Sequence, residues 1–222
     1  MNVRTTIVFS SLALIYLATL PLTPYVAQFL PKALPIVVLA VFAYTKLSTM
    51  PRYMVLTALL FSLAGDVSLA LPFADSFITG LACFFVAHLT YAICFALLHR
   101  RLQETPGDHI ISRKPKWLIS IIMVSFAVMM AVHILPASKA LFYPVVAYIS
   151  VITLMGLTAV WLAQTKLIVT GALLFVISDA ILAQSVFKTP LPLSTFWVMT
   201  TYYGAQYCLT MGLVDVFFEK RE

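Results

Sequence analysis

The chain has 222 residues, of which 62% are hydrophobic and only 10% are charged, and its mean hydropathy is +1.02. A soluble domain carries about 25% charged residues, so this composition excludes a soluble globular protein. We therefore expect an all-α, polytopic membrane protein.

Eight apolar stretches follow one another along the chain, most of them near the ~20 residues that cross a bilayer core. They cover residues 6–22, 33–45, 53–71, 77–98, 117–135, 141–163, 167–187 and 193–218. The connections are too short to hold a soluble domain. The sequence thus predicts a single transmembrane helical domain, residues 1–222, built as a bundle of about eight helices.

The 14 Lys and Arg residues are distributed unevenly between the two sides of this bundle. If the N-terminus is cytoplasmic, the cytoplasmic segments hold Arg4, Lys46, Arg52, Arg100, Arg101, Arg113, Lys114, Lys116, Lys166, Lys220 and Arg221. The other side holds only Lys32, Lys139 and Lys188. The positive-inside rule then predicts that both termini are cytoplasmic. This bias explains the net charge of +6 without a nucleic-acid partner.

Two spans carry an aspartate in an otherwise apolar setting. Asp66 lies in LLFSLAGDVSLALP, and Asp179 lies in GALLFVISDAILAQ. An ionised carboxylate near the bilayer centre costs roughly 2.5–3.5 kcal/mol on insertion scales. A protonated aspartate can also serve as a packing device, but two of them favour a functional site. Each aspartate is followed at the same spacing by Leu-Ala, which suggests a possible four-plus-four repeat.

Several polar residues fall at one depth of the predicted bundle. Most lie 12 to 14 residues from the basic residue at the cytoplasmic end of their span, which is roughly 18–21 Å. The residues of this layer are Lys32, Asp66, His88, Asp179, Tyr203 and Gln206. Tyr91 follows His88 by about one helical turn, and Tyr202 adjoins Tyr203. All eight are candidate site residues.

Each of them also has a plain structural explanation. Lys32 alone would be an interfacial lysine that extends its ammonium group to the headgroups. His88 and the neutral polar residues of the last span would make ordinary hydrogen bonds between helices. The shared depth favours a common site over these separate explanations.

Five short motifs carry a resemblance to a known family. They are Lys32-x-x-Pro35; Gly65-Asp66; Phe77-x-x-Gly80-Leu81-x-x-Phe84-x-x-x-His88-x-x-Tyr91; Gly171-Ala172-Leu173-Leu174-Phe175 running into Ser178-Asp179; and Thr201-Tyr202-Tyr203-x-Ala205-Gln206. In their order and spacing the chain resembles the YhhN-like lysoplasmalogenase family over nearly its whole length. One departure is Ser185-Val186-Phe187, where that family often has Asn-x-Phe.

The resemblance implies hydrolysis of the vinyl-ether bond of lysoplasmalogens, which releases a long-chain aldehyde and glycerophosphoethanolamine or glycerophosphocholine. A vinyl ether has no carbonyl carbon for a nucleophile to attack, so its hydrolysis begins with proton transfer to the β-carbon. Water then captures the resulting oxocarbenium ion. Two carboxyl groups in a low-dielectric site meet both needs, because one stays protonated while the other is ionised.

We hypothesise that Asp66 and Asp179 are the catalytic pair and that the other candidates support them. His88 and Tyr91 would set the protonation of the pair. The last span would position water or the glycerol hydroxyl through Tyr203 and Gln206, with Tyr202 beside them. Lys32 would meet the phosphate of the substrate. No Gly-x-Ser-x-Gly motif is present, so an ordinary ester lipase is disfavoured.

Three alternatives remain open. Asp66, His88 and Asp179 could instead be ligands of a zinc ion, although one histidine is few for zinc and the three cysteines show no metal spacing. The same residues could form the proton relay of a proton-coupled transporter. A membrane-organising protein would need no shared polar layer.

We expect no metal and no cofactor. The expected partners are a lysophospholipid substrate and membrane lipid, and the expected location is a bacterial inner membrane as a multi-pass protein.

Overall fold

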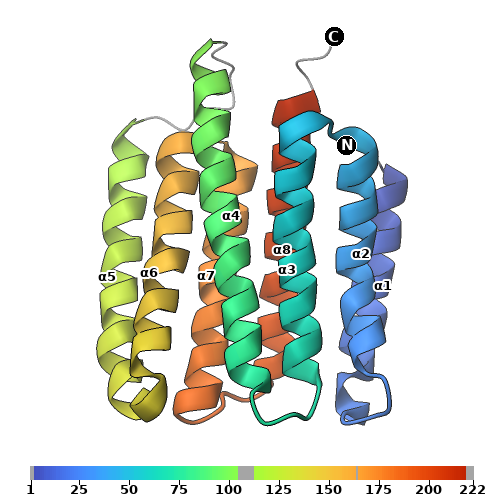
Figure 1. The fold of residues 1–222 in the computed structure, drawn as a ribbon, viewed down its shortest axis with the longest axis vertical. Helices are drawn as coiled ribbons and strands as arrows, with labels where there is room; N and C mark the ends of the chain where they lie inside the picture. Colours follow the sequence, from blue (N-terminus) through green and yellow to red (C-terminus); the bar gives the residue numbers. More distant parts are fainter. Residues whose placement is uncertain (1–2, 105–112, 164, 219–222) are drawn as a thin grey trace.

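The computed structural model describes residues 3–104, 113–163 and 165–218, and helices packed side by side make up this part of the chain (Figure 1). The α-helices are α1 (Val3–Thr19), α2 (Phe29–Lys46), α3 (Thr49–Ala70), α4 (Ser76–Glu104), α5 (Arg113–Ser138), α6 (Phe142–Thr158), α7 (Lys166–Phe187) and α8 (Ser194–Phe218). The described residues contain no strand. The predicted all-α membrane bundle is confirmed.

Each predicted span corresponds to one of these helices, since long apolar segments satisfy their backbone hydrogen bonds internally as helices. Six helical stretches in the described residues are long and apolar enough to cross a membrane, and one of them, Pro115–Ala163, contains most of α5 and all of α6. Helix α8 is not among the six; it contains the polar run Thr200–Tyr203 and Gln206. The number of membrane crossings stays a prediction.

The helices run alternately up and down, so the first turn of α1 and the last turn of α8 lie at the same end of the bundle (Figure 1). We call this the basic end, because the helix termini there carry Arg4, Lys46, Arg52, Arg100, Lys116 and Lys166. Lys139 and Lys188 lie at the opposite end. The arrangement agrees with the predicted charge asymmetry, although Lys220 and Arg221 lie outside the described residues.

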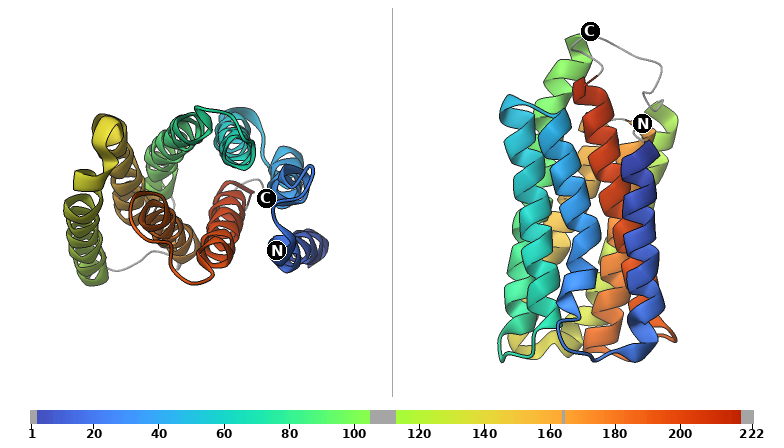
Figure 2. Two further views of the ribbon diagram at one scale, coloured as in Figure 1. Left: turned by 90° about the horizontal axis from the view of Figure 1, so that it is seen from below. Right: turned by 90° about the vertical axis from the view of Figure 1, so that its right-hand side faces the viewer.

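The cross-section of the bundle is elongated, with α1 and α5 at its two ends and α3, α4, α7 and α8 in the middle (Figure 2). Small residues allow close packing in the middle. A Cβ atom on Gly65 of α3 would lie 2.7 Å from the ring of Phe84 on α4. A Cβ atom on Gly171 of α7 would lie 2.9 Å from the backbone nitrogen of Leu209 on α8. These two tight helix pairs surround the candidate site.

Candidate functional site

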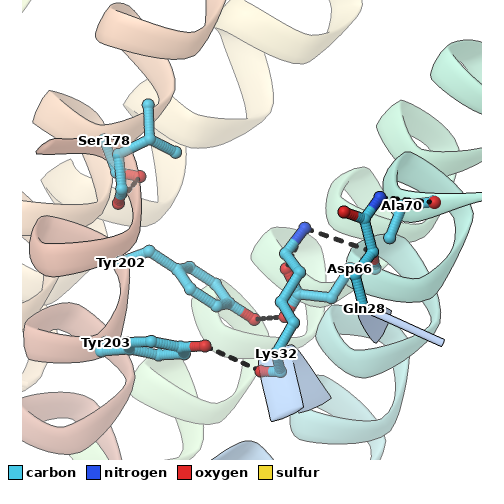
Figure 3. Close-up of polar contacts among 8 residues, drawn as sticks. Gln28, Lys32, Asp66, Ala70, Ser178, Tyr202 and Tyr203 are labelled. Carbon is cyan, nitrogen blue, oxygen red and sulfur yellow. Dashed lines mark hydrogen bonds and ion pairs between the residues drawn. The ribbon is translucent and has the colours of Figure 1, made fainter. Parts of the chain in front are cut away.

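Asp66 is buried on α3, and both of its carboxylate oxygens have partners. The Lys32 ammonium group lies 3.2 Å from Oδ1, and the Tyr202 hydroxyl donates a hydrogen bond of 2.6 Å to Oδ2 (Figure 3). Asp66 is 3% exposed, and the side chain of Lys32 is 11% exposed. Lys32 therefore does not extend its ammonium group to the lipid headgroups as an interfacial lysine would. It is the counter-ion of a buried carboxylate.

The start of α2 is tied to the neighbouring helices by its own polar groups. Lys32 Nζ also donates to the backbone carbonyl of Asp66 at 3.2 Å, and Gln28 donates to the carbonyl of Ala70 at 3.3 Å. The latter carbonyl belongs to the last turn of α3, where backbone acceptors lack partners within the helix. The Tyr203 hydroxyl donates to the carbonyl of Lys32 at 2.8 Å (Figure 3). These contacts fix the position from which Lys32 reaches Asp66.

Asp179 on α7 has a different set of partners. The hydroxyl of Tyr148 donates a hydrogen bond of 2.5 Å to Oδ2, and His88 Nε2 lies 3.2 Å from the same oxygen. His88 Nε2 is also 3.1 Å from the Tyr148 hydroxyl, so the three groups form a triangle. The His88 ring packs edge-on against Phe175 and is fully buried, whereas 12% of the Asp179 side chain is exposed.

Tyr148 is the member of this site that the sequence analysis missed. It is one of two tyrosines in the mainly apolar helix α6; the other is Tyr143. The available signal was its position: Tyr148 lies in the interior of the span, whereas Tyr143 is 80% exposed near the helix start. A hydroxyl deep in a bilayer needs a partner, because no water is present there to supply one.

Tyr91 and Gln206 form a pair of their own. The Tyr91 hydroxyl donates to Gln206 Oε1 at 2.8 Å, and both side chains are fully buried between α4 and α8. Among the described residues, no hydrogen bond joins this pair to Asp66 or Asp179. The structure thus places these two candidates beside the aspartate clusters and not in contact with a carboxylate.

The two aspartates are held in corresponding ways. Each takes one partner from the helix that precedes its own and one from the last helix of the other half of the chain. These helices are α2 and α8 for Asp66, and α6 and α4 for Asp179. The arrangement agrees with the four-plus-four repeat suggested by the sequence.

Both aspartates line one cavity of about 330 Å³, which we call the central cavity. It lies between α3, α4, α7 and α8, with α1 and α2 contributing Tyr16 and Lys32. Ser76, Ser194 and Thr195 line it at the end of the bundle opposite the basic end, and Thr195 is exposed there. The cavity therefore connects the two carboxyl groups with the surface.

This arrangement does not bring together the ligand set expected for zinc, Asp66, His88 and Asp179. Within residues 3–104, 113–163 and 165–218, no group of three or more His, Cys, Asp or Glu side chains is placed to share a metal ion. His88 contacts Asp179, but Asp66 is engaged by Lys32 and Tyr202. The chemistry that this geometry offers is proton transfer between carboxyl, phenol and imidazole groups.

Comparison with known proteins places the chain in a family. The model of the YhhN family matches residues 27–213. Human lysoplasmalogenase TMEM86B is 34% identical over 185 residues, which cover 82% of this chain and 74% of that protein. Bovine lysoplasmalogenase TMEM86A is 29% identical over 171 residues, covering 72% of this chain and 65% of the relative.

A third relative, the pig lysoplasmalogenase TMEM86B, is 32% identical over 160 residues, which cover 70% of this chain and 61% of that protein. The chain thus spans between 61% and 74% of the length of these three relatives. No solved structure matches it. The matched region contains both aspartates and all of their partners, and the chain belongs to the YhhN family.

Proposed function

We propose that the chain is an integral membrane hydrolase that cleaves the vinyl-ether bond of lysoplasmalogens, giving a long-chain aldehyde and glycerophosphoethanolamine or glycerophosphocholine. Membership of the YhhN family and relatives named lysoplasmalogenases support this activity. The observation that carries the mechanism is that Asp66 and Asp179 line one cavity yet have different partners. The carrier alternative has no comparable support.

Asp66 acts as the ionised member of the pair. Its neighbour Lys32 supplies a positive charge at 3.2 Å, and Tyr202 donates to the second oxygen, so both oxygens are stabilised as those of a carboxylate. Because the Lys32 ammonium is already paired in this way, we assign it to Asp66 and not to the substrate phosphate expected from the sequence. Tyr203 positions Lys32 through its backbone carbonyl.

Asp179 acts as the proton donor. Among the described residues it has no Lys or Arg partner, and both of its hydrogen-bonded neighbours, Tyr148 and His88, converge on the single oxygen Oδ2. The other oxygen can therefore carry a proton toward the cavity. The described contacts leave Tyr91 and Gln206 a supporting role, since they join α4 and α8.

The reaction balances with one proton shared by the two carboxyl groups. Asp179 transfers its proton to the β-carbon of the vinyl ether, which leaves an oxocarbenium ion facing two carboxylates. Carboxylates that are already in place stabilise this cation, and in a water-poor site such stabilisation contributes strongly to catalysis. Water adds to the cation and gives one proton back to a carboxylate. The hemiacetal then breaks its bond to the glycerol oxygen, which takes the hydroxyl proton, and the aldehyde leaves.

We further propose that the protein resides in a bacterial inner membrane with its basic end in the cytoplasm. The basic helix termini at one end of the bundle support this orientation. The mouth of the central cavity would then face the periplasmic side, and the lysophospholipid substrate would come from the membrane itself.

The test measures aldehyde release from a lysoplasmalogen by the purified protein in detergent with EDTA present. The wild type and Asp75→Asn, which changes an exposed aspartate between α3 and α4, should release aldehyde. Asp179→Asn should lose about 10²-fold or more, the usual contribution of a placed acid. If the Asp179→Asn protein keeps more than about a tenth of the activity, Asp179 is not the proton donor. A folded wild type that releases no aldehyde, with or without added Zn²⁺, would overturn the proposed activity.

A further inference from the structure

A second cavity, which we call the lateral cleft, lies between α4, α5, α6 and α7 and has a volume of about 80 Å³. All of its lining side chains are apolar except those of Tyr148, Thr153 and Asp179. Two of these three polar residues belong to the candidate site. A narrow apolar cleft with a carboxyl group near one end is suited to a chain with one polar end.

The lateral cleft and the central cavity meet at Asp179. Both are lined by Leu69, Phe77, Phe84, Leu182 and Asp179. The central cavity is polar by comparison, because it also contains Lys32, Asp66 and the serines at its mouth. The carboxyl group of Asp179 therefore stands at the boundary between an apolar and a polar compartment.

The length of the lateral cleft matches the depth of one bilayer leaflet. On α7 its lining runs from Val176 to Phe187, which is roughly 16 Å at a rise of about 1.5 Å per residue. Half of a hydrocarbon core of ~30 Å is about 15 Å. Asp179 lies one turn from the inner end of this run, and most of the cleft extends from there toward the end of the bundle opposite the basic end.

We infer that the lateral cleft binds the single hydrocarbon chain of the substrate, with the first carbons of the chain at Asp179 and the headgroup in the central cavity. This assignment rests on the proposed function and adds to it the place where the substrate chain binds. In a vinyl-ether lipid the double bond is formed by the first two carbons of the chain, so a chain seated in the cleft brings the β-carbon to Asp179. The glycerol carbon that bears a second chain in a diradyl lipid would lie among polar side chains, which accounts for a single-chain substrate.

The cleft contributes more to positioning the substrate chain than to the affinity for it. Lipid tails are as apolar as the cleft, so a chain gains little hydrophobic free energy by leaving the bilayer for it. Holding the chain instead fixes the reacting carbon against the acid, and such positioning raises the rate of the chemical step. Changes in the cleft should therefore act on kcat more than on KM.

The kinetic test compares a hexadecenyl with a butenyl lysoplasmalogen, whose short chain ends before Ala183, roughly 6 Å from Asp179 along α7. Ala183→Phe adds a ring to the cleft lining one turn beyond Asp179, and Ala131→Phe makes the same change on α5 outside the cleft lining. Ala183→Phe should lower kcat for the long chain by about tenfold or more relative to the short chain, while Ala131→Phe leaves the ratio of the two substrates unchanged. An unchanged ratio in Ala183→Phe would overturn the assignment. A wild type inactive on both substrates would instead overturn the proposed function.

A binding test distinguishes failure of the cleft assignment from failure of the proposed hydrolase activity. A saturated alkyl lysophospholipid with a diazirine at the end of its chain has no vinyl ether to cleave, so labelling does not depend on catalysis. Photolysis followed by peptide mass spectrometry should place the label within residues 126–134 or 145–153, which line the cleft from α5 and α6. Excess unlabelled lipid should displace it. Label spread over the outward faces of α1 or α5 would refute the assignment.

Discussion

The ion pair between Lys32 and Asp66 leads to a quantitative prediction about stability. Lys32→Met keeps a side chain of similar length but removes the ammonium group 3.2 Å from the carboxylate. Asp66 is 3% exposed, so water cannot replace the lost charge. The carboxylate would be left in the helix bundle with Tyr202 as its remaining side-chain donor.

The expected loss follows from this burial. Removing one partner of a buried ion pair costs about 3–5 kcal/mol. At roughly 2–4 °C of Tm per kcal/mol for a chain of this size, Lys32→Met should unfold about 6–20 °C below the wild type. The double variant Lys32→Met/Asp66→Asn contains no isolated charge, so most of the loss should be recovered.

The assay is thermal unfolding of the wild type, the two single variants and the double variant in one detergent. Lys188→Met is the matched control, because Lys188 is exposed at the opposite end of the bundle; its Tm should stay close to that of the wild type. Strictly additive losses in the double variant, or a Tm of Lys32→Met equal to that of the control, would show that the two residues do not form the pair.

Two further predictions concern the other aspartate and the packing beside it. Tyr148→Phe removes the hydroxyl that donates to Asp179 at 2.5 Å. This hydrogen bond stabilises the carboxylate that forms as Asp179 gives up its proton, and a hydrogen bond to a charged group contributes about 1.5–3 kcal/mol. The kcat for aldehyde release should therefore fall roughly 10- to 150-fold. Tyr143→Phe, on the 80% exposed tyrosine of the same helix, should be neutral, and equal rates for the two variants would contradict the role of Tyr148. Gly171→Ala would press a methyl group against backbone atoms of α8 at 2.9–3.0 Å and should cost about 1–3 kcal/mol, measured as a lower Tm. Gly204→Ala meets only a side chain at 3.2 Å and should lower the Tm less; the reverse order would refute this account of the α7–α8 contact.

Depth along the bundle was predictable from the sequence because every helix rises by the same amount per residue. Counting residues from the basic helix ends placed Lys32, Asp66, His88 and Asp179 in one layer. The observed contacts join Lys32 with Asp66 and His88 with Asp179 within this layer. Because the helical backbone is regular, the depth of each side chain along the bundle can be estimated from the sequence alone.

The direction in which each side chain points around its helix was not predictable in the same way. His88 and Tyr91 are three residues apart and were expected to serve one site. Each instead reaches a different neighbour: His88 contacts Asp179, and Tyr91 contacts Gln206. Residues at this spacing differ by about 60° around the helix axis, which is enough to face different helices. Which helix stands on which side depends on tertiary packing.

The sharing of partners between the two halves of the chain affects how the site can form as the helices pack. Each aspartate depends on a residue from the half to which it does not belong, so neither four-helix half contains a complete cluster. The two halves must therefore pack against each other before either carboxyl group has both of its partners.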